Sequence, residues 1–133
     1  MEFKSIEFDN KSADIKPSMF GDLDRLSQFL LDNPDFKLKI SGHTDSYGTA
    51  EYNLDLSQRR AQAIMDYIVY FGQVSRARIA AQGYGSSMPI IPVEQSDFDR
   101  QLNRRVEFEL YRPSLQELEE TRMLEKVEKP TDW

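Results

Sequence analysis

The chain has 133 residues and a mass of 15.5 kDa, which fits one domain and excludes a two-domain organisation. Hydrophobic residues make up 39% of it, too many for a disordered chain, yet its apolar runs are far shorter than the ~18 residues of a membrane span. The net charge of −6 argues against a nucleic-acid surface, and the absence of Cys excludes a disulfide framework. The single His severely limits metal and acid/base chemistry.

The pattern of apolar residues predicts a strand, a helix and a second strand in the first third of the chain. Alternation over residues 6–8 favours a short strand, and apolar residues at steps of three and four over 17–33 favour a helix. Alternation over residues 36–40 predicts a second strand with one buried face. The apolar positions behind these predictions are Ile6, Phe8, Met19, Leu23, Leu26, Leu30, Phe36, Leu38 and Ile40.

A long helix and two further strands are predicted next. A stripe at helical spacing predicts a helix over about residues 49–71, and Gly72 supplies its stop. We expect a third strand over residues 78–84 and a fourth around 106–111, where apolar and polar residues alternate. The stripe of the long helix consists of Asn53, Ser57, Ala61, Ile64, Ile68 and Phe71.

The connection between the last two predicted strands shows neither the helical spacing nor the strand alternation of apolar residues. Pro89 and Pro92 break regular pairing, so we interpret this segment as an irregular loop. We expect Phe98 and Leu102 to pack it onto the body of the domain.

The element order β-α-β-α-β-β predicts an α+β fold, in which a mixed sheet carries both main helices on one face. We place this domain at residues 1–112. Residues 113–133 carry a net charge of −3, half of the total, and a loose apolar stripe. They are predicted to form a charged C-terminal extension with a short surface helix. The N-terminus shows no secretion signal, so export of a parent protein would depend on a signal outside this chain.

Three segments hold candidate functional residues, and the first is the loop at residues 42–48. It follows the second strand and contains Thr44 and Asp45 between glycines. A strand-to-helix loop of this kind with one carboxylate is a common place for a binding residue. The alternative is a turn in which Asp45 caps the following helix.

The second segment lies on the long helix. Asn53 and Arg60 are seven residues apart, so they point from one face with Ser57 between them, whereas Arg59 is rotated by about 100°. That face continues into the apolar stripe, which places Arg60 against the sheet, where an arginine needs an anionic partner. The partner is either a ligand or an internal carboxylate such as Asp45.

The third segment opens the last strand. Alternation predicts Arg104 on the side of Val106 and Phe108, and Arg105 on the opposite side. From that position Arg104 could reach either a ligand or the C-terminus of a helix.

Taken together, these motifs resemble the OmpA-like C-terminal domain shared by OmpA porins, the Pal lipoprotein and the MotB stator protein. The resemblance runs from about Ile6 to Leu110. It is carried by Phe8, Ser12-Ala13, Ile15, Gly42-His43-Thr44-Asp45, Gly48, Tyr52-Asn53, Leu56-Ser57, Arg60-Ala61, Gly83-Tyr84-Gly85, Pro89 and Asn103-Arg104-Arg105-Val106-Glu107. Two features depart from the family: the loop at 86–102 is unusually apolar, and Lys11 stands where some relatives have a small polar residue.

The resemblance implies non-catalytic binding of peptidoglycan through the diaminopimelate of its stem peptide. In members of that family, the residue matching Asp45 pairs with the diaminopimelate ammonium, and the residue matching Arg60 binds the diaminopimelate carboxylate. Asn53 and Arg104 help to line the pocket, and Thr44 belongs to the same set. One anion and one bidentate cation are what a zwitterionic amino-acid centre requires.

The resemblance also implies a location and a parent protein. The domain would act in the periplasm as an exported part of a membrane-anchored or multidomain envelope protein, and would tether that protein or the outer membrane to the cell wall. Neither a cofactor nor a metal is expected.

Two other functional classes were weighed against peptidoglycan binding. A metal-assisted hydrolase could use His43, Asp45 and Asp55, but one His and no second ligand cluster make this class weak. A structural or protein-interaction domain would keep the fold without the ligand. The presence of Asp45, Asn53 and Arg60 argues against it.

Overall fold

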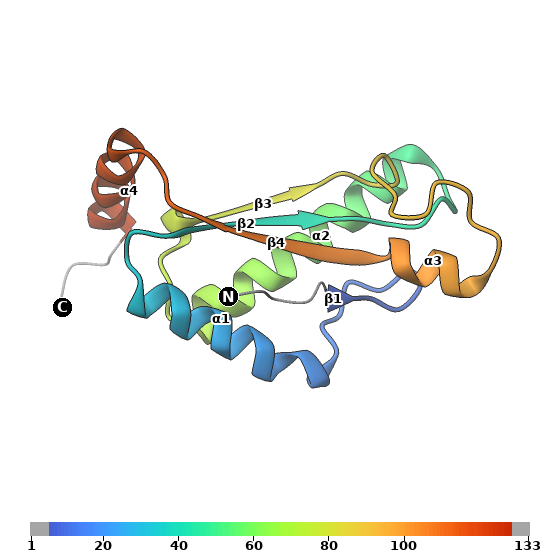
Figure 1. Ribbon diagram of the computed structural model, residues 1–133, viewed down its shortest axis with the longest axis horizontal. Helices are drawn as coiled ribbons and strands as arrows, with labels where there is room; N and C mark the ends of the chain where they lie inside the picture. Colours follow the sequence, from blue (N-terminus) through green and yellow to red (C-terminus); the bar gives the residue numbers. More distant parts are fainter. Residues whose placement is uncertain (1–5, 129–133) are drawn as a thin grey trace.

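The computed structural model describes residues 6–128 and shows a four-stranded mixed sheet with helices α1 and α2 on one face (Figure 1). The elements are β1 (Ile6–Glu7), the 3-10 helix η1 (Pro17–Met19), α1 (Phe20–Asp32), β2 (Lys37–Gly42), α2 (Ala50–Tyr70), the 3-10 helix η2 (Arg76–Arg78), β3 (Ile79–Gly83), α3 (Asp97–Asn103), β4 (Arg105–Tyr111) and α4 (Leu115–Glu128). The strand order is β1-β4-β2-β3, with β2 and β3 parallel and the other pairs antiparallel. The predicted α+β class is therefore confirmed. No helix within residues 6–128 is long and apolar enough to cross a membrane.

The predicted apolar stripes form one core between the helices and the sheet. Most positions of the α2 stripe are buried, but Phe71 lies beyond the helix end and is 76% exposed, so the stripe stops at Ile68. The core consists of Phe8, Leu23, Leu26, Leu30, Leu38, Ile40, Ala61, Ile64, Met65, Ile68, Val74, Ile79 and Val106.

Two glycines let α2 approach the sheet at the strand ends where the loop with Asp45 begins. Gly42 ends β2 and pairs in register with Gly83, the last residue of β3. A Cβ on Gly42 would lie 2.1 Å from the backbone oxygen of Ser57, and one on Gly83 would lie 2.4 Å from the backbone nitrogen of Gln58. The hydroxyl of Ser57 also accepts a 2.8 Å hydrogen bond from the backbone N–H of Gly85. This close approach holds the first half of α2 against the ends of both strands.

The segment between β3 and β4 differs from its prediction. It contains a short helix, α3, which begins at the cap formed by Ser96, whose side chain accepts from the N–H of Asp99. A Ser followed three residues later by an acid is a helix-start signal that the proline-based interpretation passed over. The expectation that Phe98 packs this segment onto the body is wrong, since Phe98 is 68% exposed.

The C-terminal extension contains α4, a helix of 14 residues that lies at the opposite end of the long axis from α3 (Figure 1). Thr121 is buried, whereas Leu115, Met123 and Leu124 are exposed. The helix contacts η2. The domain boundary at residue 112 stays a prediction, because α4 does touch the rest of the chain.

His43 lies on the sheet face away from α2, stacked on Tyr84 with ring centroids 5.7 Å apart. Its ring is buried, and neither ring nitrogen has a hydrogen-bond partner among the described residues. Burial, followed by the positive charge of Arg105, lowers the pKa of His43 to about 4, although Glu107 acts in the opposite direction.

The close approach at Gly42 predicts opposite effects for two Gly→Ala substitutions. Gly42→Ala should lower the free energy of unfolding by about 1–3 kcal/mol, because its new Cβ would meet the backbone of α2. Gly21→Ala is the matched control: it lies in α1, where the added Cβ would make an ordinary 3.7 Å contact with the Arg25 side chain, and should raise stability by about 0.5–1 kcal/mol. Urea unfolding of both variants measures this, and unchanged stability of Gly42→Ala would refute the close contact.

The environment of His43 predicts a pH-dependent stability. The folded-state pKa lies below the unfolded value of about 6.5, so the unfolded chain takes up the proton first as the pH falls. Stability from this residue is complete above pH 6.5 and falls by about 2–3 kcal/mol as the pH decreases toward 4. His43→Phe keeps the stacking and removes the titration, so urea unfolding between pH 7 and pH 4 should show a smaller loss. An equal loss in both proteins would contradict the assignment.

Candidate functional site

A cavity of about 320 Å³ lies where the loop after β2, the start of α2 and the loop after β1 meet. All five residues predicted for the site line it, although they come from three separate segments of the sequence. The lining residues are Asn10, Lys11, Thr44, Asp45, Tyr47, Gly48, Tyr52, Asn53, Leu56, Arg60 and Arg104.

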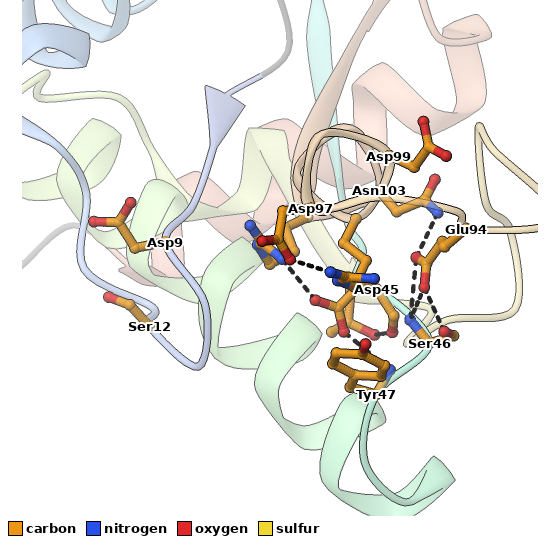
Figure 2. A network of polar contacts seen from close by, with 12 residues as sticks. Asp9, Ser12, Asp45, Ser46, Tyr47, Glu94, Asp97, Asp99 and Asn103 are labelled. Atoms are coloured by element: carbon orange, nitrogen blue, oxygen red, sulfur yellow. Dashed lines mark hydrogen bonds and ion pairs between the residues drawn. The ribbon is translucent and has the colours of Figure 1, made fainter.

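Asp45 presents a nearly buried carboxylate that is held from two sides (Figure 2). Its Oδ1 accepts a 3.0 Å hydrogen bond from the backbone N–H of Tyr47, and its Oδ2 accepts a 2.8 Å bond from Nη1 of Arg104. The helix-capping alternative is wrong, because the side chain of Thr49 caps α2. Asp45 therefore shapes the loop while its carboxylate still lines the cavity.

Arg60 is completely buried, and its guanidinium binds three backbone carbonyls. Nε donates to the carbonyl of Ser12 at 2.7 Å, Nη1 to that of His43 at 2.9 Å and Nη2 to that of Asp9 at 3.0 Å. Figure 2 shows Asp9 and Ser12 on the loop that follows β1. A guanidinium has five N–H donors, so one on each terminal nitrogen has no partner among the described residues.

The alternative internal salt bridge between Arg60 and Asp45 is not formed: the carboxylate of Asp45 pairs with Arg104 instead. No described carboxylate lies within ion-pair distance of Arg60. Burial, followed by the charge of Arg104, lowers the pKa of Arg60 to about 10, and Asp45 only partly opposes this. A ligand carboxylate would supply the missing countercharge.

The two neighbouring arginines of α2 have the separate orientations that the helical period predicts. Arg60 lines the cavity, whereas Arg59 is half exposed and pairs with Asp55 on the outer surface of α2 at 2.8 Å. The prediction that Arg59 and Arg60 point from different faces of the helix is confirmed.

The two arginines that follow α3, Arg104 and Arg105, are placed partly as predicted. Arg105 lies opposite Val106 and binds Glu107 at 2.7 Å on the other face of the sheet. Arg104, however, caps the C-terminus of α3, and β4 begins only after it. Strand alternation therefore did not determine its direction. Its side chain lines the cavity and pairs there with Asp45.

Thr44 and Asn53 support the cavity wall. The hydroxyl of Thr44 donates to the carbonyl of Asp45 at 2.9 Å, and the amide of Asn53 reaches the same carbonyl at 3.5 Å. Both side chains are buried. They restrain the loop whose carboxylate lines the cavity.

Two residues absent from the predicted set connect the loop after β3 to this site (Figure 2). Glu94 accepts hydrogen bonds from the backbone N–H and the hydroxyl of Ser46, and a 2.7 Å bond from the amide of Asn103. Burial alone would raise the pKa of Glu94, but these bonds and Arg100 lower it overall. Asn103 belongs to the motif at residues 103–107, so the sequence indicated it, whereas no motif indicated Glu94.

The structure does not bring the residues of the hydrolase alternative together. His43 stacks on Tyr84, Asp45 pairs with Arg104, and Asp55 pairs with Arg59 on the surface. Within residues 6–128 no three His, Cys, Asp or Glu side chains are grouped so that they could hold a metal ion.

Comparisons with known proteins place this arrangement in a family. The model of the OmpA family matches residues 7–104. Outer membrane porin F of Pseudomonas fluorescens is 39% identical over 77% of this chain and 31% of its own length, and the peptidoglycan-binding protein ArfA of Mycobacterium bovis is 37% identical over the same shares. The crystal structure of the peptidoglycan-associated lipoprotein from Burkholderia pseudomallei has a TM-score of 0.78 and 28% identity, covering 82% of this chain and 91% of that one.

This chain spans about a third of the length of these two sequence relatives. The family model nevertheless covers most of the chain, including the three segments that form the cavity. The chain therefore belongs to the OmpA family.

Proposed function

We propose that this domain binds peptidoglycan non-covalently through the diaminopimelate of the stem peptide. It acts in the periplasm, as part of a membrane-anchored or multidomain envelope protein, and tethers that protein or the outer membrane to the cell wall. The domain carries out no chemical step. Among its relatives, the names of ArfA and of the Burkholderia pseudomallei lipoprotein refer to peptidoglycan, and porin F is named an outer membrane protein.

One observation carries the proposal: Arg60 is a buried cation with no carboxylate partner within residues 6–128, and it lines a cavity that also contains the carboxylate of Asp45. The free end of diaminopimelate bears one ammonium and one carboxylate on the same carbon. A carboxylate can accept from the two unpaired N–H groups of Arg60 in a bidentate arrangement. The ammonium can donate to Asp45, whose carboxylate has more acceptor positions than its two present bonds use.

The remaining lining suits the same ligand. Tyr52 and Leu56 add apolar surface next to the charged groups, which fits the methylene chain between the two ends of diaminopimelate. Thr44 and Asn53 add polar atoms that hold the loop in place. A pocket of this kind selects by charge placement and excludes water from the ion pairs it forms.

The Asp45–Arg104 pair also suits the alternative, a domain that keeps this fold for structural or protein-interaction purposes only. In that case Asp45 would stabilise the loop and bind no ligand. The two functions predict different effects of a neutral residue at position 45 on the binding of peptidoglycan.

Asp45→Asn should release the domain from diaminopimelate-type sacculi. The amide keeps one acceptor oxygen, which can retain the bond from either Tyr47 or Arg104 but not both, and it removes the charge that binds the ammonium, so the affinity should fall about 10- to 150-fold. Asp55→Asn is the matched control, because Asp55 pairs with Arg59 on the outer surface, and it should bind as the unchanged protein does. Pulldown with purified sacculi, together with a thermal melt of each variant, measures this. If folded Asp45→Asn binds sacculi as well as the unchanged protein, the assignment of Asp45 fails, and if the folded unchanged protein does not bind sacculi, the structural alternative is correct.

A further inference from the structure

The cavity carries more positive charge than a diaminopimelate centre can balance. Among the described residues, its lining holds three cationic side chains, Lys11, Arg60 and Arg104, against the single carboxylate of Asp45, in a chain whose net charge is −6. A zwitterionic centre adds one charge of each sign and leaves this excess unchanged. The N-terminus of the 21-residue helix α2 also faces the cavity through Tyr52 and Asn53 and adds to the positive potential.

Lys11 is the cation of this set that has no assigned partner. Arg104 pairs with Asp45, and Arg60 binds three carbonyls, but the ammonium of Lys11 makes no ion pair or hydrogen bond among the described residues. The nearby carboxylate of Asp9 pairs instead with Lys16 at 3.2 Å. The side chain of Lys11 is exposed at the cavity and available to a ligand.

The backbone holds Lys11 in a conformation that a lysine rarely adopts. Its φ is 59°, in the left-handed region that favours glycine and asparagine. The turn that contains it is fixed from outside, because Arg60 binds the carbonyls of Asp9 and Ser12 on either side. Strained residues of this kind persist where surrounding contacts hold them, and they concentrate at binding sites. The same arginine that lines the cavity therefore also orients the turn that presents Lys11.

We propose that Lys11 binds a second carboxylate of the stem peptide, one that lies outside the zwitterionic centre held by Asp45 and Arg60. This inference rests on the proposed function and extends it to a neighbouring part of the same ligand. A stem peptide offers such a carboxylate at two places: the α-carboxylate of the γ-linked D-glutamate before diaminopimelate, and the carboxylate at the C-terminal end. Lys11 would make the domain sensitive to amidation of the stem, a change that removes a carboxylate without touching the centre.

The test uses three synthetic tetrapeptides with the sequence L-Ala-γ-D-Glu-diaminopimelate-D-Ala. One carries all its carboxylates, one has the D-glutamate α-carboxylate converted to the amide, and one has the C-terminal carboxylate converted to the amide. Each is titrated calorimetrically, at low ionic strength, into the unchanged protein, Lys11→Gln and Lys37→Gln. Lys37→Gln is the matched control, because it changes the net charge by the same amount at a position in β2 that does not line the cavity.

We expect one amidation to weaken binding to the unchanged protein and to Lys37→Gln by about two- to fivefold, the range for a solvent-accessible charge pair. The sensitive peptide identifies which carboxylate Lys11 binds. Lys11→Gln should bind all three peptides with the same affinity, lower than that of the unchanged protein for the unmodified peptide by the same factor. Lys11→Arg, which keeps the charge, should still distinguish the peptides.

Equal binding of all three peptides to the unchanged protein would overturn the role of Lys11, and so would a preference that survives in Lys11→Gln. An equal loss in Lys37→Gln would attribute the effect to net charge and overturn it as well. These results leave the proposed function intact if binding still depends on Asp45. Failure of the unchanged protein to bind any of the peptides would overturn both.

Discussion

The buried guanidinium of Arg60 is the interaction on which the cavity depends. It joins three parts of the chain, because it extends from α2 and binds the carbonyls of Asp9 and Ser12 after β1 and of His43 after β2. Its charge also lies against the ring of Phe8, with Cζ 5.1 Å from the ring centroid. Carbonyl oxygens accept from three of its five N–H groups without neutralising the charge. The fold therefore stabilises a cation but leaves it ready for an anion.

In this arrangement, the contacts that stabilise the fold also position the residues that line the cavity. The glycines that end β2 and β3 allow α2 to approach the sheet, and that approach is what places Arg60 beneath the loop that carries Asp45. Burial lowers the pKa of Arg60, which means that the folded protein holds the charge at a cost in free energy. A bound carboxylate would reduce that cost. The site is thus expected to stabilise the domain when it is occupied.

Much of the fold and part of the site could be predicted from local patterns. Apolar periods predicted both main helices and the central strands, and the helical period separated Arg60 from Arg59 correctly, because it reports directions within one element. Partners across elements were harder, since nothing in the period shows that Asp45 pairs with Arg104 rather than with Arg60. Helix α3 was missed because Pro89 and Pro92, which precede it in the same connection, suggested a loop. Consequently Arg104 was assigned to a strand that starts one residue later.

The most direct test compares the binding of two stem peptides that differ only in the carboxylate proposed to bind Arg60. A diaminopimelate peptide carries the ammonium and the carboxylate, whereas the matching lysine peptide keeps the ammonium and lacks the carboxylate. Calorimetric titration of the unchanged protein should show about 30- to 150-fold weaker binding of the lysine peptide, because a charge-assisted pair with Arg60 is lost from a site largely shielded from water. Equal affinity for the two peptides would contradict the claim that Arg60 binds the ligand.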